Sequence, residues 1–210
     1  ANFTNEGGVG GTVRFLKNVT GLWLVQGCRK AWGAEAAPTY EELARAAAEA
    51  PPFAALVDPD HPGFLNPPDM PEAVAAYCRA TGQTPPASRA ALVRSLFESL
   101  ALKYRHVIDQ LRLVRGRPVE RIHVIGGGSR NALLCRFTAE ATGLPVVAGP
   151  AEATAVGNIL VQAMAMGRID SPAGIRAIIR DSFDLRTYEP GGTREGWEEA
   201  YARFRAILGA

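Results

Sequence analysis

Apolar side chains recur at three- and four-residue spacing along most of this chain, which is the period of an α-helix that buries one face. The longest stripe follows Ser88 and runs from Leu92 to Val114. Residues such as Thr39, with Glu42 three positions later, are typical helix N-caps. The pattern predicts helices over residues 14–32, 39–50, 71–81, 88–114, 133–141, 171–180 and 193–208, and one more that ends at residue 167.

Short continuous apolar runs, which are typical of buried strands, occur at only two places, residues 122–125 and 145–148. Residues 186–190 are expected to be extended, and residues 2–11 to form a polar loop or a short edge strand. Helices therefore dominate, with strands too few for a full sheet. We predict an α/β architecture in which an incomplete sheet is covered by many helices.

The stretch Arg121–Asn131 reads R-I-H-V-I-G-G-G-S-R-N and places Gly126, Gly127 and Gly128 between a strand and a helix. Glycine adopts positive φ and lets a ligand approach the backbone, and a helix N-terminus attracts anions. The stretch is therefore a candidate site for the phosphates or the purine edge of a nucleotide. The alternative is a tight turn with no ligand.

Neither common nucleotide motif is present. The dinucleotide fingerprint needs a glycine where Asn131 stands and an acidic residue at the end of the next strand, which lacks one. A phosphate-binding P-loop needs a lysine after the glycines, and none follows.

Two amide side chains, Asn18 and Gln26, are expected near one face of the first predicted helix, in line with Leu22. Amides on a mostly apolar helix need hydrogen-bond partners. They are either core amides bonded to backbone or groups that face a ligand cleft. The small residues Ala153, Ala155 and Gly157 leave a similar choice between close helix–sheet packing and a ligand contact.

Composition excludes several classes of protein. The chain has 210 residues, 47% hydrophobic and 21% charged, with a formal charge of +2, which argues against a nucleic-acid partner. Its three cysteines are widely spaced and suggest neither disulfides nor a metal site. No apolar run is long enough to span a membrane, and no signal peptide is recognisable, so we expect a cytoplasmic protein.

Several stretches together resemble the FGGY sugar kinases. These are T-N-E-G-G at residues 4–8, F-L-K-N-V-T-G-L-W-L-V-Q at 15–26, F-L-N-P-P-D-M at 64–70, H-V-I-G-G-G-S-R-N at 123–131 and G-P-A-E-A-T-A-V-G-N at 149–158. The resemblance covers nearly the whole chain. Within the family, the stretch from Asn18 to Gln26 resembles the rhamnulokinase branch.

The resemblance implies a ribonuclease-H-like, actin-like ATPase fold and the transfer of the γ-phosphoryl group of Mg-ATP to the C1 hydroxyl of L-rhamnulose. By this likeness Asn18 is the sugar-binding amide, and Gln26, Gly126, Gly127, Gly128 and Asn131 contact ATP. No metal ligand is implied in this chain, because Mg²⁺ is held by the nucleotide.

The same resemblance implies that residues 1–210 are the C-terminal, nucleotide-binding lobe. The catalytic aspartate, the N-terminal lobe and the phosphate-contacting first hairpin of this lobe would lie upstream of Ala1. We therefore expect the chain to be inactive alone, since phosphoryl transfer requires both reactants to be positioned. A kinase for another ketose or polyol, or a non-catalytic nucleotide-binding module, remains the alternative.

Overall fold

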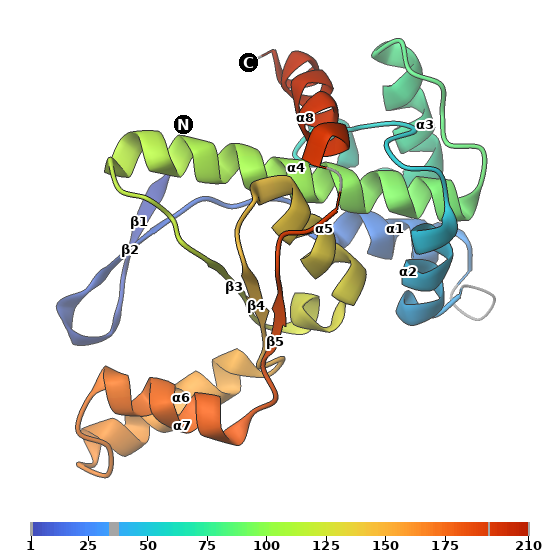
Figure 1. Cartoon of the computed structure of the whole chain (residues 1–210). Coiled ribbons are helices and arrows are strands. Elements are labelled where there is room, and N and C mark those ends of the chain that lie inside the picture. Colours follow the sequence, from blue (N-terminus) through green and yellow to red (C-terminus); the bar gives the residue numbers. More distant parts are fainter. Residues whose placement is uncertain (1, 34–37, 193, 210) are drawn as a thin grey trace.

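The computed structural model describes residues 2–33, 38–192 and 194–209 (Figure 1). Two sheets and a set of helices make up this part of the chain. The helices are α1 (Trp23–Ala31), α2 (Tyr40–Glu49), α3 (Met70–Ala80), α4 (Arg89–Arg115), α5 (Ala132–Thr142), α6 (Ala153–Ala165), α7 (Pro172–Ser182) and α8 (Arg194–Leu208), with short 3-10 turns η1 (Val9–Gly11), η2 (Pro62–Phe64) and η3 (Gly127–Arg130).

The strands form two separate sheets. β1 (Thr4–Gly7) and β2 (Val13–Leu16) make an antiparallel hairpin. The second sheet has the order β3 (Ile122–Val124), β4 (Val146–Ala148), β5 (Arg186–Tyr188), with β3 and β4 parallel and β5 antiparallel to β4. The predicted α/β architecture, with few strands and many helices, is thus confirmed.

The core lies around α4, which crosses the whole body with α5 on one side and α8 on the other (Figure 1). Its first part is buried on all sides, and its apolar residues pack against α1, α2, α5 and α8. The loop between α2 and α3 packs into the same core through Leu56, Val57 and Phe64, whereas Leu65 is 78% exposed. This core fixes the base on which the small sheet and its loops are built.

Helices α6 and α7 form a hairpin that projects from the end of the three-stranded sheet (Figure 1). Neither helix has a buried residue, and Ile159 is 65% exposed although α6 is strongly apolar. Close helix–sheet packing, one of the two alternatives for the small residues, does not occur at Gly157, because no atom lies within 4 Å of where a Cβ would stand.

The predicted helix over residues 14–32 is wrong in its first half. Residues up to Leu16 form β2, which pairs with β1, and residues 17–21 have no regular structure. The α-helix begins only at Trp23. Asn18 is therefore not on a helix face with Gln26.

Most other predicted helices are confirmed, together with their caps. Thr39 and Glu42 form a reciprocal capping box, and Ser88 accepts the N–H of Ala91 at the start of α4. Thr193, the first residue of the last predicted helix, lies outside the described residues. Within the described ranges, no helix combines the length and the apolar character needed to cross a membrane.

Candidate nucleotide site

The glycine triplet turns the chain at the carboxyl end of β3. Gly126 has φ +74°, a conformation that costs other residues energy. Gly126 O accepts the N–H of Ser129 at 3.0 Å and its hydroxyl at 2.7 Å, which closes the turn η3. The triplet leads into the 3-10 turn η3, and α5 begins at Ala132, within one residue of the predicted start. β3 itself is half-buried, not fully buried.

A second loop, residues 149–152, follows the carboxyl end of the parallel strand β4 and contacts the glycine turn. Gly149 N–H donates to Val124 O at 2.8 Å, and Gly126 N–H donates to Pro150 O at 3.2 Å. Ligands of α/β folds characteristically bind outside the carboxyl ends of parallel strands. The two loops meet at such an edge.

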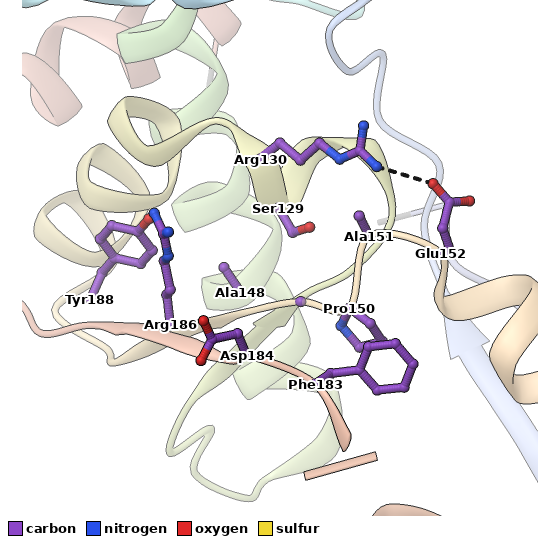
Figure 2. Close-up of a pocket in the computed structure, with 11 residues that line it drawn as sticks. Ser129, Arg130, Ala148, Pro150, Ala151, Glu152, Phe183, Asp184, Arg186 and Tyr188 are labelled. Atoms are coloured by element: carbon purple, nitrogen blue, oxygen red, sulfur yellow. Dashed lines mark hydrogen bonds and ion pairs between the residues drawn. The ribbon is translucent and has the colours of Figure 1, made fainter. Parts of the chain in front are cut away.

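A cavity of about 430 Å³ opens beside these two loops (Figure 2). Its third wall is the segment that follows α7 and enters β5. Pocket volumes of this order are typical of small-molecule sites. The lining residues are Ser129, Arg130, Ala148, Gly149, Pro150, Ala151, Glu152, Phe183, Asp184, Arg186 and Tyr188.

Charged and aromatic side chains stand around the cavity (Figure 2). Arg130 and Glu152, which both line it, form an ion pair of 3.2 Å, and both side chains are more than 70% exposed, so solvent screens their attraction. Asp184 and Arg186 come from the β5 side, with Phe183 37% exposed beside Pro150. The site can thus offer an aromatic face, a cation and hydrogen-bond acceptors to a polar, planar ligand.

The thiol of Cys135, next to the glycine turn, is made unreactive by burial. Cys135 lies with its Sγ 3.9 Å from Gly128 O, and burial raises the pKa of this thiol to about 11. It stays protonated at neutral pH and is no nucleophile. Cys28, Cys78 and Cys135 are all free and buried.

The predicted ATP-binding residues fall into three places. Gly126, Gly127 and Gly128 adjoin the cavity without lining it, and a Cβ at Gly127 would meet no atom within 4 Å. Asn131 caps α5, because its Oδ1 accepts the N–H of Leu134 at 3.0 Å. Gln26 lies on α1, which is a separate element from the cavity wall.

Asn18 and Gln26 are both exposed, so the interpretation that they are core amides is wrong. Asn18 lies in the irregular segment between β2 and α1. Neither residue lines the cavity. If they bind ligands, they do so on a surface distinct from the walls of this cavity.

Sequence reasoning missed the third wall of the cavity. Residues 186–190 were expected to be extended, but nothing local indicated that this strand adds antiparallel to β4 after two intervening helices. That pairing brings Phe183, Asp184 and Arg186 beside Pro150.

Among the described residues, no group of three or more His, Cys, Asp or Glu side chains is placed to hold a metal ion. In the cavity, Glu152 is paired with Arg130, and Asp184 is the other acidic side chain on its wall. These residues do not fit a protein-held Mg²⁺ site.

The fold and the loops at the strand ends are those of a carbohydrate kinase domain. Residues 1–166 match the C-terminal domain of the FGGY family of carbohydrate kinases. The chain belongs to this family.

The chain is 52% identical over 204 residues to a rhamnulokinase of Bacteroides thetaiotaomicron, an alignment that covers 97% of this chain and 41% of that protein. A rhamnulokinase of Pectobacterium carotovorum is 42% identical over 208 residues, with 99% and 41% covered. The chain therefore spans about two fifths of the length of these curated relatives.

Solved kinase structures share the fold. A xylulose kinase from Rhodospirillum rubrum superposes with a TM-score of 0.59 at 25% identity, covering 89% of this chain and 36% of that one. A glycerol kinase from Plasmodium falciparum, solved with ADP, gives a TM-score of 0.59 at 12% identity and the same coverage. Both are sugar or polyol kinases, and they support the actin-like ATPase fold that the sequence predicted.

Proposed function

We propose that this chain is the C-terminal lobe of a kinase that transfers the γ-phosphoryl group of ATP to the C1 hydroxyl of L-rhamnulose. The observation that carries this proposal is the 52% identity to a rhamnulokinase over nearly the whole chain. It is about twice the identity to the xylulose kinase of the same fold. Because the reaction consumes ATP, we place the protein in the cytoplasm.

The glycine turn and the adjoining cavity would bind the nucleotide. At Gly127 the backbone is bare, and a ligand can approach it without displacing a side chain. The aromatic Phe183 and the guanidinium of Arg186 offer contacts to a planar base and to anionic oxygens. Gln26 would contact the nucleotide from α1, and Asn131 would support the turn by capping α5.

Asn18 would bind the sugar through its exposed amide, whose donor and acceptor suit neighbouring hydroxyl groups. Phosphoryl transfer depends on holding the acceptor hydroxyl in line with the phosphate. This lobe would contribute one side of that alignment. The general base and the remaining sugar contacts would belong to the N-terminal lobe of the complete protein.

Mg²⁺ accompanies ATP in such transfers and neutralises charge on the phosphates. The described residues of this lobe hold no group of acidic or imidazole side chains suited to a metal ion, so we propose that the nucleotide holds it.

The test is a sugar panel with the complete protein, measured by ADP release. We expect L-rhamnulose to be preferred over D-xylulose and glycerol by at least roughly 100-fold in kcat/KM, because a site built for particular hydroxyls rejects analogues that leave them unpaired. The 210-residue chain alone should bind ADP yet show no turnover.

Two results would redirect the proposal. Preference for D-xylulose would assign the chain to another branch of the family, in line with its 25% identity to a xylulose kinase. Nucleotide binding with no sugar phosphorylated would favour a non-catalytic module. An Asn18→Ala variant, which should raise the sugar KM and leave the ATP KM unchanged, separates the sugar contact from the nucleotide contact.

A further inference from the structure

The irregular segment of residues 17–22, which contains Asn18, is fixed by hydrogen bonds to distant parts of the chain. Lys17 Nζ donates to Gln110 Oε1 on α4 at 3.2 Å. Thr20 N–H donates to Asp60 Oδ1 at 2.7 Å. At the end of the segment, Trp23 Nε1 donates to Phe64 O at 3.3 Å. Tertiary contacts therefore set its conformation, since it has no ladder or helix of its own.

The bond from Thr20 is the shortest of the three and ends on a carboxylate that is itself held in place. Lys103 Nζ lies 3.0 Å from Asp60 Oδ2 and 2.7 Å from Asp58 Oδ1. The two oxygens of Asp60 thus have different partners, one the ammonium of Lys103 and the other the backbone of Thr20. The acidic pair belongs to the packed loop between α2 and α3.

Burying the charged side chain of Lys103 at this place costs desolvation free energy. Its side chain is only 8% exposed. Burial alone would lower its pKa, but the hydrogen bonds that its ammonium donates to Asp58 and Asp60 outweigh that effect and raise the pKa, so the lysine stays charged. Replacing a buried ion pair by apolar side chains is often neutral or stabilising. The cluster of Lys103, Asp58 and Asp60 is therefore poorly explained by stability alone.

The effect that apolar side chains could not reproduce is that the cluster fixes the position of the backbone near Asn18. A charged acceptor makes a stronger hydrogen bond to a backbone N–H than a neutral one. Lys103, on the rigid helix α4, fixes the carboxylate plane of Asp60, and Asp60 fixes the backbone two residues after Asn18. Only a short stretch of backbone separates this anchor from the amide.

We propose that Asp60, oriented by Lys103, is a positioning residue that holds the backbone of Thr20 and thereby places the Asn18 amide for the sugar. This inference rests on the proposed function of Asn18. It assigns a role in sugar binding to a residue that does not touch the sugar.

The test compares Asp60→Ala with Asp60→Asn in the complete protein. Both variants remove the charge opposite Lys103, but asparagine keeps an oxygen that can accept the Thr20 N–H. We expect Asp60→Ala to raise the sugar KM on the order of tenfold, the lower end for losing a bond to a charged acceptor. The ATP KM should change less than twofold, and Asp60→Asn should restore most of the sugar affinity.

Glu98→Gln serves as the matched control for a general loss of stability. Glu98 is a buried carboxylate in a different ion pair, with Arg94, and it also accepts a backbone N–H, that of Phe53. If Glu98→Gln lowers the melting temperature as much as Asp60→Ala does, the sugar KM of Glu98→Gln should still equal that of the wild type. A sugar KM that rises equally in all three variants, or together with the ATP KM, would overturn the proposal.

Hydrogen exchange separates this inference from the proposed function. In the 210-residue chain, Asp60→Ala should speed amide exchange in residues 17–21 at least tenfold while α4 stays protected, and Asp60→Asn should not. Unchanged exchange would refute the anchor itself. If exchange behaves as expected but the complete protein phosphorylates none of the sugars, the anchor stands, whereas the proposed function and the sugar role of Asn18 fail.

Discussion

Asn131 Oδ1 accepts the backbone N–H of Leu134 at 3.0 Å, so the last residue of the glycine turn is also the cap of the helix α5. The turn and the helix are joined by one side chain. A nucleotide contact by Asn131, implied by the family resemblance, would come in addition to this structural role.

Replacing Asn131 tests the two roles separately. Asn131→Ala should lower the free energy of unfolding by about 1 kcal/mol, because the cap is lost, whereas Asn131→Asp should keep it. Chemical denaturation measures both. If Asn131→Asp keeps the stability but lowers the affinity for ADP, Asn131 also contacts the nucleotide. If Asn131→Asp binds ADP as tightly as the wild type, Asn131 is only a helix cap.

Gly127 and Gly126 make a matched pair for testing the glycine turn. Gly127→Val should raise the Kd for ADP roughly tenfold or more, a loss of about 1.4 kcal/mol, since the new side chain fills open space where the ligand approaches. Its unfolding free energy should change little. Gly126→Val should instead cost about 1–3 kcal/mol of stability, because φ +74° strains a branched residue. Titration calorimetry and denaturation distinguish the two; a Gly127→Val protein that binds ADP normally contradicts the site.

Glu98 predicts a pH dependence of stability. Its side chain is fully buried, and desolvation raises its pKa to about 7 despite the hydrogen bonds from Arg94 and from Phe53 N–H. The folded-state pKa is therefore above that of the unfolded chain. The stabilisation from this group is complete below about pH 4.5 and is lost as pH rises through about 7.

We expect the contribution of Glu98 to fall by roughly 1–3 kcal/mol between pH 4.5 and 7.5. Glu98→Gln should remove that part of the slope, because glutamine does not titrate. Urea denaturation at a series of pH values measures it. A variant with the same pH slope as wild type would show that Arg94 keeps the carboxylate ionised throughout.

The apolar surface of α6 predicts self-association of the 210-residue chain. Ile159 and Met166 are 65% and 74% exposed, and exposed apolar patches mark contact surfaces. Ile159→Lys should weaken association several-fold in sedimentation experiments without changing the melting temperature. Gln162→Lys adds the same charge on the same helix without removing apolar surface, and it should have a smaller effect. A strictly monomeric wild-type chain would contradict this expectation.

Local signals predicted most of the helices. Thr39 with Glu42, Ser88 and the glycines after strands or helices act over a few residues, so the sequence displays them directly. The interior of α4 was likewise readable from its stripe, because burial against α2 and α5 requires that spacing. For the same reason Gly126–Gly128 could be located as a turn before any coordinates were known.

The structure of other segments could not be predicted, because it depends on pairing with distant parts of the chain. Phe15, Leu16 and Val19 imitate helical spacing, yet Phe15 pairs with Asn5 in a hairpin. The irregular segment after β2 depends on bonds to residues 40 or more positions away. Phe183 and Arg186 reach the cavity only because β5 joins β4 across a two-helix excursion. The local spacing of apolar residues does not indicate which distant segments will pair.

Helix α4, with 27 residues, is about 40 Å long and behaves as a stiff rod. Lys103 and Gln110 on this rod secure the segment that carries Asn18, and α5 lies along it and carries the glycine turn. The separation between the Asn18 segment and the glycine turn is thereby set by contacts along one continuous helix.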